Sequence, residues 1–306
     1  MSTTFTLAHL SDVHLSPIVG FTPRHWNAKR ALGFINWQRK RRFVHRRSVA
    51  DQIVADVKAQ APGHIAISGD LINIGLPAEY EAAALWLKSV GAGRDVSVVP
   101  GNHDIYTPIG SDPGVARWAA HMTSDDWGLA HGAASDRPFP YVRRLGPLAL
   151  VGLNSAVETP PGIATGRVGA DQLAAVARCL AQSAQAGLYR VVMIHHPPLP
   201  GLTRPHHELL DAAELAAVLA STGANLVLHG HTHLATVNTL AGLRGPIPIV
   251  GVGSASAARS RGTEPLAQYN LLRITGQPGS WQTTLTRRGL RVGSAHIVDL
   301  DTRVLP

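Results

Sequence analysis

The sequence predicts an α/β protein with two facing mixed β-sheets flanked by helices. Three observations support this fold class. Short apolar runs typical of buried strands alternate with segments of helical periodicity up to about residue 233. Five of these runs end in polar side chains, and strand-like runs then follow one another as far as residue 298. This order of elements gives mixed sheets whose outer faces are covered by helices.

The five runs that end in polar groups define the first part of the chain. They cover residues 6–15, 64–75, 98–106, 190–198 and 225–233. Because ligands bind outside the carboxyl ends of strands in α/β sheets, we expect one sheet edge to collect these groups. The groups are, in chain order, Asp12 and His14, Asp70, Asn102 with His103 and Asp104, His195 and His196, and His231 and His233.

The third of these runs, VVPGNHDIY, shows the pattern most clearly. Pro100 and Gly101 end the strand and turn the chain, which places the next three polar residues at the strand end. Asn, Asp and Gly are also ordinary turn residues, so this run alone does not separate a functional site from a plain turn. The recurrence of the pattern in five runs favours the functional interpretation.

The remaining strands follow from the same rules. Residues 138–145 and 147–155 predict a β-hairpin inside the first part of the chain. After residue 233 we expect only strands, at residues 236–240, 246–252, 267–274, 281–287 and 290–298. Asn154 ends its strand as the other polar groups do, so we expect it near a substrate, with a plain turn as the alternative.

The collected side chains suit metal ions. Carboxylates, imidazoles and one amide, without a thiolate, form a ligand set for Mn, Fe, Co, Ni or Zn. There are too many ligands for one ion, and two ions that share a bridging carboxylate would use them all. A neutral carbonyl oxygen from Asn102 would limit the negative charge of such a site.

The ordered motifs DVH, GD, GNHD, HHPP and GHTH resemble those of the calcineurin-like metallophosphoesterases over about residues 5–275. VVMIHHPP and GNHD are most similar to the class III cyclic-nucleotide and glycerophosphodiesterase branch. The resemblance implies a four-layer α/β/β/α sandwich and two divalent or mixed-valence metal ions, with manganese and iron expected before zinc, cobalt or nickel. It implies one metal held by Asp12, His14, Asp70 and His233, and a second held by Asp70 as the bridge with Asn102, His195 and His231.

The resemblance also implies roles for residues that do not bind metal. His103 is similar to a histidine that faces the phosphate, where it could stabilise charge or protonate the leaving oxygen. Asp104 would orient the ring of His103, although a carboxylate after a turn also caps helices. His196 follows the metal ligand His195 and is expected to support it or to line the substrate pocket.

The implied activity is hydrolysis of a P–O bond, most readily in a phosphodiester. Two cations lower the pKa of a shared water and clamp phosphoryl oxygens for in-line attack. A pyrophosphohydrolase that acts on a lipid-linked or nucleotide-sugar substrate is the alternative. A scaffold that has lost its metals would lack a ligand, and none is missing here.

We expect the 306 residues to form a single domain, because the motifs between residues 12 and 233 must converge. The only cysteine, Cys179, is placed off the apolar face of the helical stretch 171–183, unpaired and consistent with a reducing compartment. No apolar run approaches the ~20 residues of a membrane span. The start of the chain shows no basic region typical of a signal peptide, so a cytoplasmic location is expected.

An insertion at about residues 17–47 interrupts the family pattern. The chain has 28 Lys and Arg against 20 Asp and Glu, and nine of the basic residues but no acid lie between Val13 and Ala50. The concentration of charge in one segment argues against a nuclease, so no nucleic-acid partner is expected. Basic residues interleaved with aromatic ones at 20–47 predict either a cap packed on the domain or peripheral contact with an anionic inner membrane.

Overall fold

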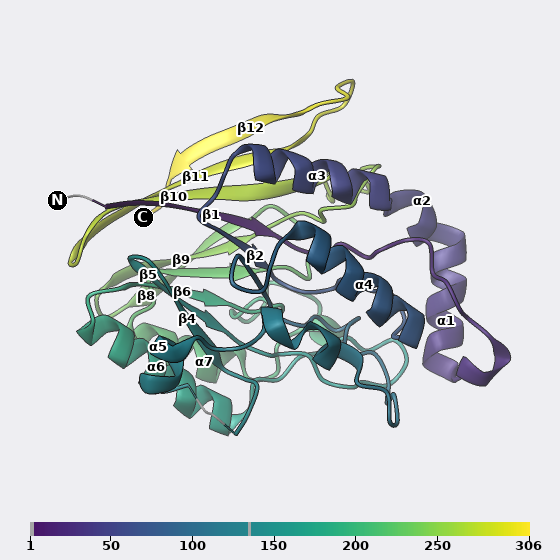
Figure 1. The fold of residues 1–306 in the computed structure, drawn as a ribbon, viewed down its shortest axis with the longest axis horizontal. Coiled ribbons are helices and arrows are strands. Elements are labelled where there is room, and N and C mark those ends of the chain that lie inside the picture. The colour runs from purple at the N-terminus through teal and green to yellow at the C-terminus, as the bar shows by residue number, and fades with distance from the viewer. Residues whose placement is uncertain (1–2, 134–135) are drawn as a thin grey trace.

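The computed structural model describes residues 3–133 and 136–306. Two six-stranded sheets face each other and helices cover their outer sides, which confirms the predicted fold class (Figure 1). The strands are β1 Thr3–Leu10, β2 His64–Ile67, β3 Val96–Val98, β4 Tyr141–Leu145, β5 Leu148–Gly152, β6 Tyr189–Met193, β7 Leu226–His229, β8 Val237–Gly242, β9 Gly245–Gly251, β10 Gln268–Gln277, β11 Ser280–Leu290 and β12 Ile297–Val304.

The first sheet has the strand order β12-β11-β10-β1-β2-β3. β1, β2 and β3 are parallel, with Leu7 of β1 opposite His64 of β2, and Ile65 of β2 opposite Val96 of β3. β10 pairs antiparallel with β1, and β11 and β12 extend that edge as an antiparallel meander. The carboxyl ends of β1, β2 and β3 therefore point the same way, which brings the first three polar motifs together.

The second sheet has the strand order β4-β5-β6-β7-β9-β8. Its four central strands are parallel, while β4 and β8 close the two edges in antiparallel fashion. The antiparallel pair of β4 and β5 is the predicted hairpin, which is confirmed. The HHPP and GHTH motifs follow β6 and β7, so they leave this sheet at the carboxyl ends of its parallel strands. There His195 Nδ1 lies 2.6 Å from the carbonyl of Ser68, which follows β2 of the first sheet.

Successive side chains of a strand point to opposite faces of the sheet, so alternate residues belong to different hydrophobic clusters. In β5, Leu148 and Leu150 belong to the core cluster shared by the two sheets, whereas Val151 packs with the helices on the outer face of the second sheet. Figure 1 shows α3 and α4 on one side of the molecule and α6 and α7 on the other. The helices are α1 Ala28–Asn36, α2 Arg42–Val44, α3 Arg47–Ala59, α4 Pro77–Val90, α5 Asp126–Ala130, α6 Ala170–Gln185 and α7 Ala212–Thr222.

Two local expectations were wrong. Residues 290–298 are not one strand, because a turn separates the end of β11 from β12. Cys179 is not off the buried face of α6 but fully buried in the cluster with Val176 and Leu180. None of the helices in the described residues combines the length and apolar character needed to cross a membrane.

The insertion forms a helical cap that leaves β1 and returns to α3. Helix α1 continues directly through a π-helical turn at Trp37–Arg41 into α2. Trp37 packs with Ile18, Ile74, Leu76 and Tyr106 in a small separate core, and Phe21 and Phe34 lie against it. We call residues 20–47 the cap from here on.

Candidate metal centre

The predicted ligands lie on loops with an unusual backbone. Only six non-glycine residues of the described chain have a positive φ, and five are predicted metal ligands. Their φ angles lie between 42° and 66°, in the left-handed region that costs L-residues energy. These five are Asp12, His14, Asp70, His231 and His233. Strained conformations of this kind persist where the surrounding structure holds them, and they cluster at functional sites.

Hydrogen bonds hold the first two ligand loops in place. The backbone N–H groups of Asp12 and His14 donate to the carbonyl oxygens of Gly69 and Asp70, each at 2.9 Å. The carboxylate of Asp104 accepts hydrogen bonds from the backbone N–H groups of Gly101, Asp70, Leu71 and Ile72. This corrects the expected role of Asp104, because its carboxylate ties the GD and GNHD loops together and does not contact the ring of His103.

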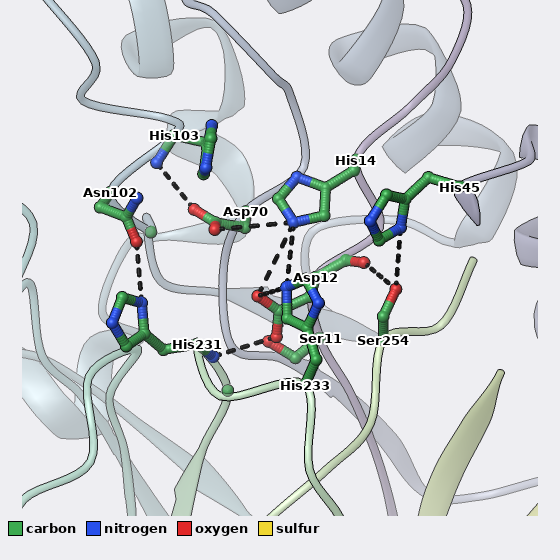
Figure 2. A network of polar contacts seen from close by, with 12 residues as sticks. Ser11, Asp12, His14, His45, Asp70, Asn102, His103, His231, His233 and Ser254 are labelled. Atoms are coloured by element: carbon green, nitrogen blue, oxygen red, sulfur yellow. Dashed lines mark hydrogen bonds and ion pairs between the residues drawn. The ribbon is translucent and has the colours of Figure 1, made fainter. Parts of the chain in front are cut away.

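The first group of donors comes from three of the loops (Figure 2). His14 Nε2 lies 3.3 Å from His233 Nε2 and 3.8 Å from Asp70 Oδ2. His233 Nε2 lies 3.2 Å from Asp12 Oδ1. Asp12, His14 and His233 thus offer donor atoms close enough to share one ion.

A second group lies on the other side of Asp70. His195 Nε2 is 3.5 Å from Asp70 Oδ2 and 3.2 Å from Asn102 Oδ1. His231 Nδ1 is 2.9 Å from the same Asn102 oxygen. Asp70 Oδ2 therefore lies between His14 and His195, which is the position a bridging ligand requires.

The remote nitrogens of all four histidines face carbonyl or carboxylate oxygens. His14 Nδ1 lies 3.1 Å from the carbonyl of Ile72, and His195 Nδ1 lies 2.6 Å from that of Ser68. His231 uses Nε2 for the carbonyl of His207 at 2.9 Å, and His233 Nδ1 lies 3.6 Å from Glu264 Oε2. A proton on each remote nitrogen leaves a lone pair on the inward one, as metal-binding histidines require.

The residues therefore fit divalent cations. Asp12 Oδ1 is fully buried and faces only imidazole nitrogens, those of His233 at 3.2 Å and His14 at 4.0 Å, with no backbone donor in the described chain. Burial disfavours the charged form of His195, but Asp70 and Asp12 outweigh it and raise the pKa of His195 to about 9. Burial likewise disfavours the charged form of His233, but Asp12 and Glu264 outweigh it and raise the pKa of His233 to about 9. The carboxylates thus favour positive charge at this place.

A cavity of about 660 Å³ opens beside the cluster. Its wall includes Asp70, Asn102 and His231, together with His103. His103 is held from both sides: its backbone N–H donates to Asp70 Oδ1 at 2.8 Å, and its Nδ1 lies 2.5 Å from the carbonyl of Asn73. Burial, with Arg41 as the next cause, lowers the pKa of His103 to about 3.

Two predicted substrate contacts are not found. His196 is fully buried, with Nδ1 at 2.8 Å from Ser155 Oγ and Nε2 at 3.1 Å from the carbonyl of Ala164. The centre of its ring lies 4.4 Å from that of His231, so it packs against a predicted ligand. The side-chain oxygen of Asn154 accepts a hydrogen bond from the backbone N–H of Ala156 at 2.9 Å. Asn154 is therefore a turn residue, which was the alternative interpretation. Within the described residues, neither side chain lines the cavity.

Sequence reasoning missed several residues around the site. Glu264 supports His233 from the loop before β10, and no sequence pattern marks it. His45 lies 2.9 Å from Ser256 Oγ through Nδ1, and its ring packs 4.7 Å from that of His14. Arg41 of the cap reaches His103 and His14, and its only signal was membership of a basic segment.

Comparison with known proteins agrees with this geometry. The sequence profile of the family described as "Calcineurin-like phosphoesterase" matches residues 5–235. A protein of Rhodococcus erythropolis named "Probable cyclic nucleotide phosphodiesterase" is 30% identical over 201 residues, which cover 64% of this chain and 59% of that protein. The chain thus spans less than two thirds of this curated relative's length.

Solved structures share the fold. A dimetal phosphatase from Danio rerio superposes with a TM-score of 0.58 at 13% identity, over 97% of this chain and 98% of that one. Purple acid phosphatase PPD1 from yellow lupin seeds gives 0.56 at 11% identity, over 99% of this chain and 54% of that one. At these identities the likeness concerns the fold alone. With the profile match over most of its length and every motif residue in place, the chain belongs to the calcineurin-like phosphoesterase family.

Proposed function

We propose that this chain is a binuclear metal-dependent phosphodiesterase. The observation that carries the proposal is the position of Asp70 Oδ2 between two groups of inward-facing imidazole nitrogens, 3.8 Å from His14 and 3.5 Å from His195. One ion would take Asp12, His14, Asp70 and His233, and the other Asp70, Asn102, His195 and His231. Manganese and iron are the first candidates, and zinc, cobalt and nickel suit the same donors.

Two divalent cations would supply a hydroxide nucleophile at neutral pH and neutralise phosphoryl charge. The chain's own residues complete the site. Asp104 fixes the two loops that carry Asp70 and Asn102 through four backbone hydrogen bonds. His103 faces the cavity without joining either donor group, so it is placed to meet the phosphoryl group or to protonate the leaving oxygen. A bound phosphoryl anion would favour the protonated form that burial and Arg41 disfavour in its absence. We propose that residues 1–306 act as one domain in this reaction.

The diester preference rests on two supports. The relative from Rhodococcus erythropolis is named "Probable cyclic nucleotide phosphodiesterase". The cavity of about 660 Å³ is also larger than a phosphate needs and falls in the range typical of small-molecule sites. A pyrophosphate linkage in a nucleotide-sugar or lipid-linked substrate is the second candidate, because Lys29, Arg41, Arg204 and Arg261 line the same cavity.

A panel of substrates tests the proposal. Metal-reconstituted protein is assayed with bis-p-nitrophenyl phosphate, p-nitrophenyl phosphate, cyclic nucleotides, glycerophosphodiesters and a nucleotide-sugar pyrophosphate. We expect the diesters to be hydrolysed fastest and Asp70→Ala to abolish turnover with loss of bound metal. Turnover of the monoester alone would contradict the diesterase, and wild-type turnover and metal content in Asp70→Ala would contradict the bridged pair.

Peripheral membrane contact through the cap is a separate part of the proposal. Leu32, Ile35 and Phe43 are 57%, 42% and 44% exposed, so the cap presents apolar side chains on its surface. Exposed apolar side chains beside cations suit an anionic lipid surface, where each cation contributes about 1 kcal/mol. Sedimentation with phosphatidylglycerol vesicles tests it. We expect the wild-type protein to bind the vesicles at low salt and the Leu32→Ser/Phe43→Ser variant to lose this binding. If the wild-type protein does not bind at low salt, the contact is refuted.

A further inference from the structure

Three cations of the cap point toward the body of the protein, and two of them have structural partners. Arg30 donates to the carbonyl oxygens of Ile74 and Gly75, at 3.3 and 2.6 Å. Lys29 Nζ donates to the carbonyl and hydroxyl oxygens of Thr159, both at 2.8 Å. These contacts satisfy the buried charges and fasten the cap to two loops beside the metal centre.

Arg41, the third, has no such partners. Its Nη1 lies 2.9 Å from His103 Nε2, and its Nη2 lies 3.3 Å from His14 Nε2. No carboxylate in residues 3–133 and 136–306 forms an ion pair with it, and no carbonyl oxygen there accepts its protons. Burial lowers the pKa of Arg41 and outweighs the attraction of Asp70, Asp12 and Glu264, because these carboxylates lie beyond ion-pair distance and no anion of the described chain contacts the guanidinium directly.

The local helix geometry singles out Arg41 within the basic segment. The π-helical turn Trp37–Arg41 changes the phase of the cap helix where it passes the metal centre. Arg39, Lys40 and Arg42 are exposed, whereas Arg41 lines the cavity with His103 and Asp70. The backbone on both sides is fixed, because Trp37 Nε1 donates to Ser16 Oγ at 3.2 Å and the N–H of Arg46 donates to the carbonyl of Ser256 at 2.9 Å.

We propose that Arg41 is a substrate-binding residue that grips a non-bridging phosphoryl oxygen beside His103, so that the cap forms part of the active site. This inference rests on the proposed phosphoesterase function. The planar fork of an arginine matches phosphoryl oxygens in geometry as well as charge. A cation held by His14 and the guanidinium of Arg41 would also repel each other, and a phosphoryl anion between them offsets that repulsion.

The test compares Arg41→Gln with Arg39→Gln, a matched control two residues earlier. Arg39 is exposed and has no hydrogen-bond or ion-pair partner in the described part of the chain. Inorganic phosphate binding is measured by calorimetry on metal-loaded protein, metal affinity by competition with a chelating dye, and turnover with bis-p-nitrophenyl phosphate. Arg41→Gln is expected to weaken phosphate binding and raise KM by about 10- to 100-fold, as for a lost charge-assisted hydrogen bond. Arg41→Lys should recover part of this loss, and Arg39→Gln should match the wild type.

The readouts separate substrate binding from a structural role. If Arg41 binds substrate, Arg41→Gln keeps or increases metal affinity and melts no lower than the wild type in the absence of phosphate, because an uncompensated charge is gone. Unchanged phosphate affinity in Arg41→Gln, or a loss of metal and thermal stability without a change in KM, overturns the inference alone. A wild-type protein that neither binds phosphate nor hydrolyses any ester overturns the proposed function as well.

Discussion

Replacing Gly101 with alanine tests whether the metal centre depends on the close approach of two ligand loops. Gly101 follows β3 and precedes the proposed ligand Asn102. A Cβ at this position would lie 2.2 Å from Asp70 Oδ1, 2.6 Å from the backbone nitrogen of Asp70 and 2.7 Å from His195 Cε1. All three atoms belong to proposed metal ligands, so the substitution acts on the site without removing any donor.

The size of the effect follows from these distances. Non-bonded heavy atoms pack comfortably at about 3.5 Å, so the Asp70 carboxylate and the His195 ring must each retreat by roughly 1 Å. Metal–ligand distances tolerate only about 0.2 Å. Repositioning of this kind costs about 1–3 kcal/mol in a packed interior, and we expect metal affinity to fall by about 10- to 100-fold.

Metal content after dialysis against a dilute chelator, measured by elemental analysis, is the assay. Gly110→Ala is the control, since nothing lies within 4 Å of its Cβ and its φ of +60° imposes only local backbone strain. We expect Gly101→Ala to lose metal while Gly110→Ala retains it. Wild-type metal content and turnover in Gly101→Ala would show that the loops approach less closely than described, and the bridged arrangement would have to be abandoned.

Three further predictions address catalysis, stability and metal dependence. His103→Ala should keep both metals but slow hydrolysis by about 10²- to 10⁴-fold, and loss of metal instead would make His103 a ligand. Asp56 accepts hydrogen bonds from Tyr269 at 2.6 Å and Arg288 at 2.9 Å, which outweigh burial and lower its pKa. Its stabilisation is therefore present above the unfolded pKa of about 3.9 and lost as pH falls through the folded value. Urea unfolding should show Asp56→Asn less stable by about 1 kcal/mol at pH 7, with the gap narrowing as the pH falls below about 3.9, and a gap that does not change over this range would refute this. Chelation should lower the Tm by about 5 °C or more, and an unchanged Tm after complete metal removal would contradict it.

The candidate metal centre was predictable because the residues proposed as ligands combine chemical type with position. Each donor follows an apolar run, and the carboxyl ends of parallel strands meet at one edge. The order of strands and polar residues in the sequence therefore predicted that Asp12, Asp70 and His195 lie close together. The two-sheet architecture was predictable for the same reason, since strand and helix periodicities differ over most of the chain.

Apart from the turn that divides residues 290–298, the errors share a physical cause: they concern which way a side chain points. Helix α6 is rich in alanine, so small residues occur on every side of it and helical periodicity does not define one apolar face. For this reason the sequence did not show that Cys179 lies on the buried face. Asp104 follows a turn, and its carboxylate was expected to contact the ring of the adjacent His103. It instead accepts hydrogen bonds from the backbone N–H groups of four other residues. Arg41 differs from the adjacent arginines only through the phase of a π-helical turn, which no composition or spacing reveals.

The strained loops explain why metal binding and folding should be coupled here. A left-handed non-glycine residue costs about 1–3 kcal/mol, and Asp and His lie toward the lower end. Five such ligands together approach the whole stability of a typical domain, about 5–15 kcal/mol. Hydrogen bonds such as that from the N–H of His14 to the carbonyl of Asp70 offset part of this cost. Ions that bind only the folded arrangement offset more, by about 2.7 kcal/mol at one hundred times the dissociation constant. A chain of this length gains roughly 2 °C per kcal/mol, which gives the shift expected on chelation. If the proposed ligands hold metal, the strain in their loops is therefore expected to make the stability of the fold depend on the bound ions.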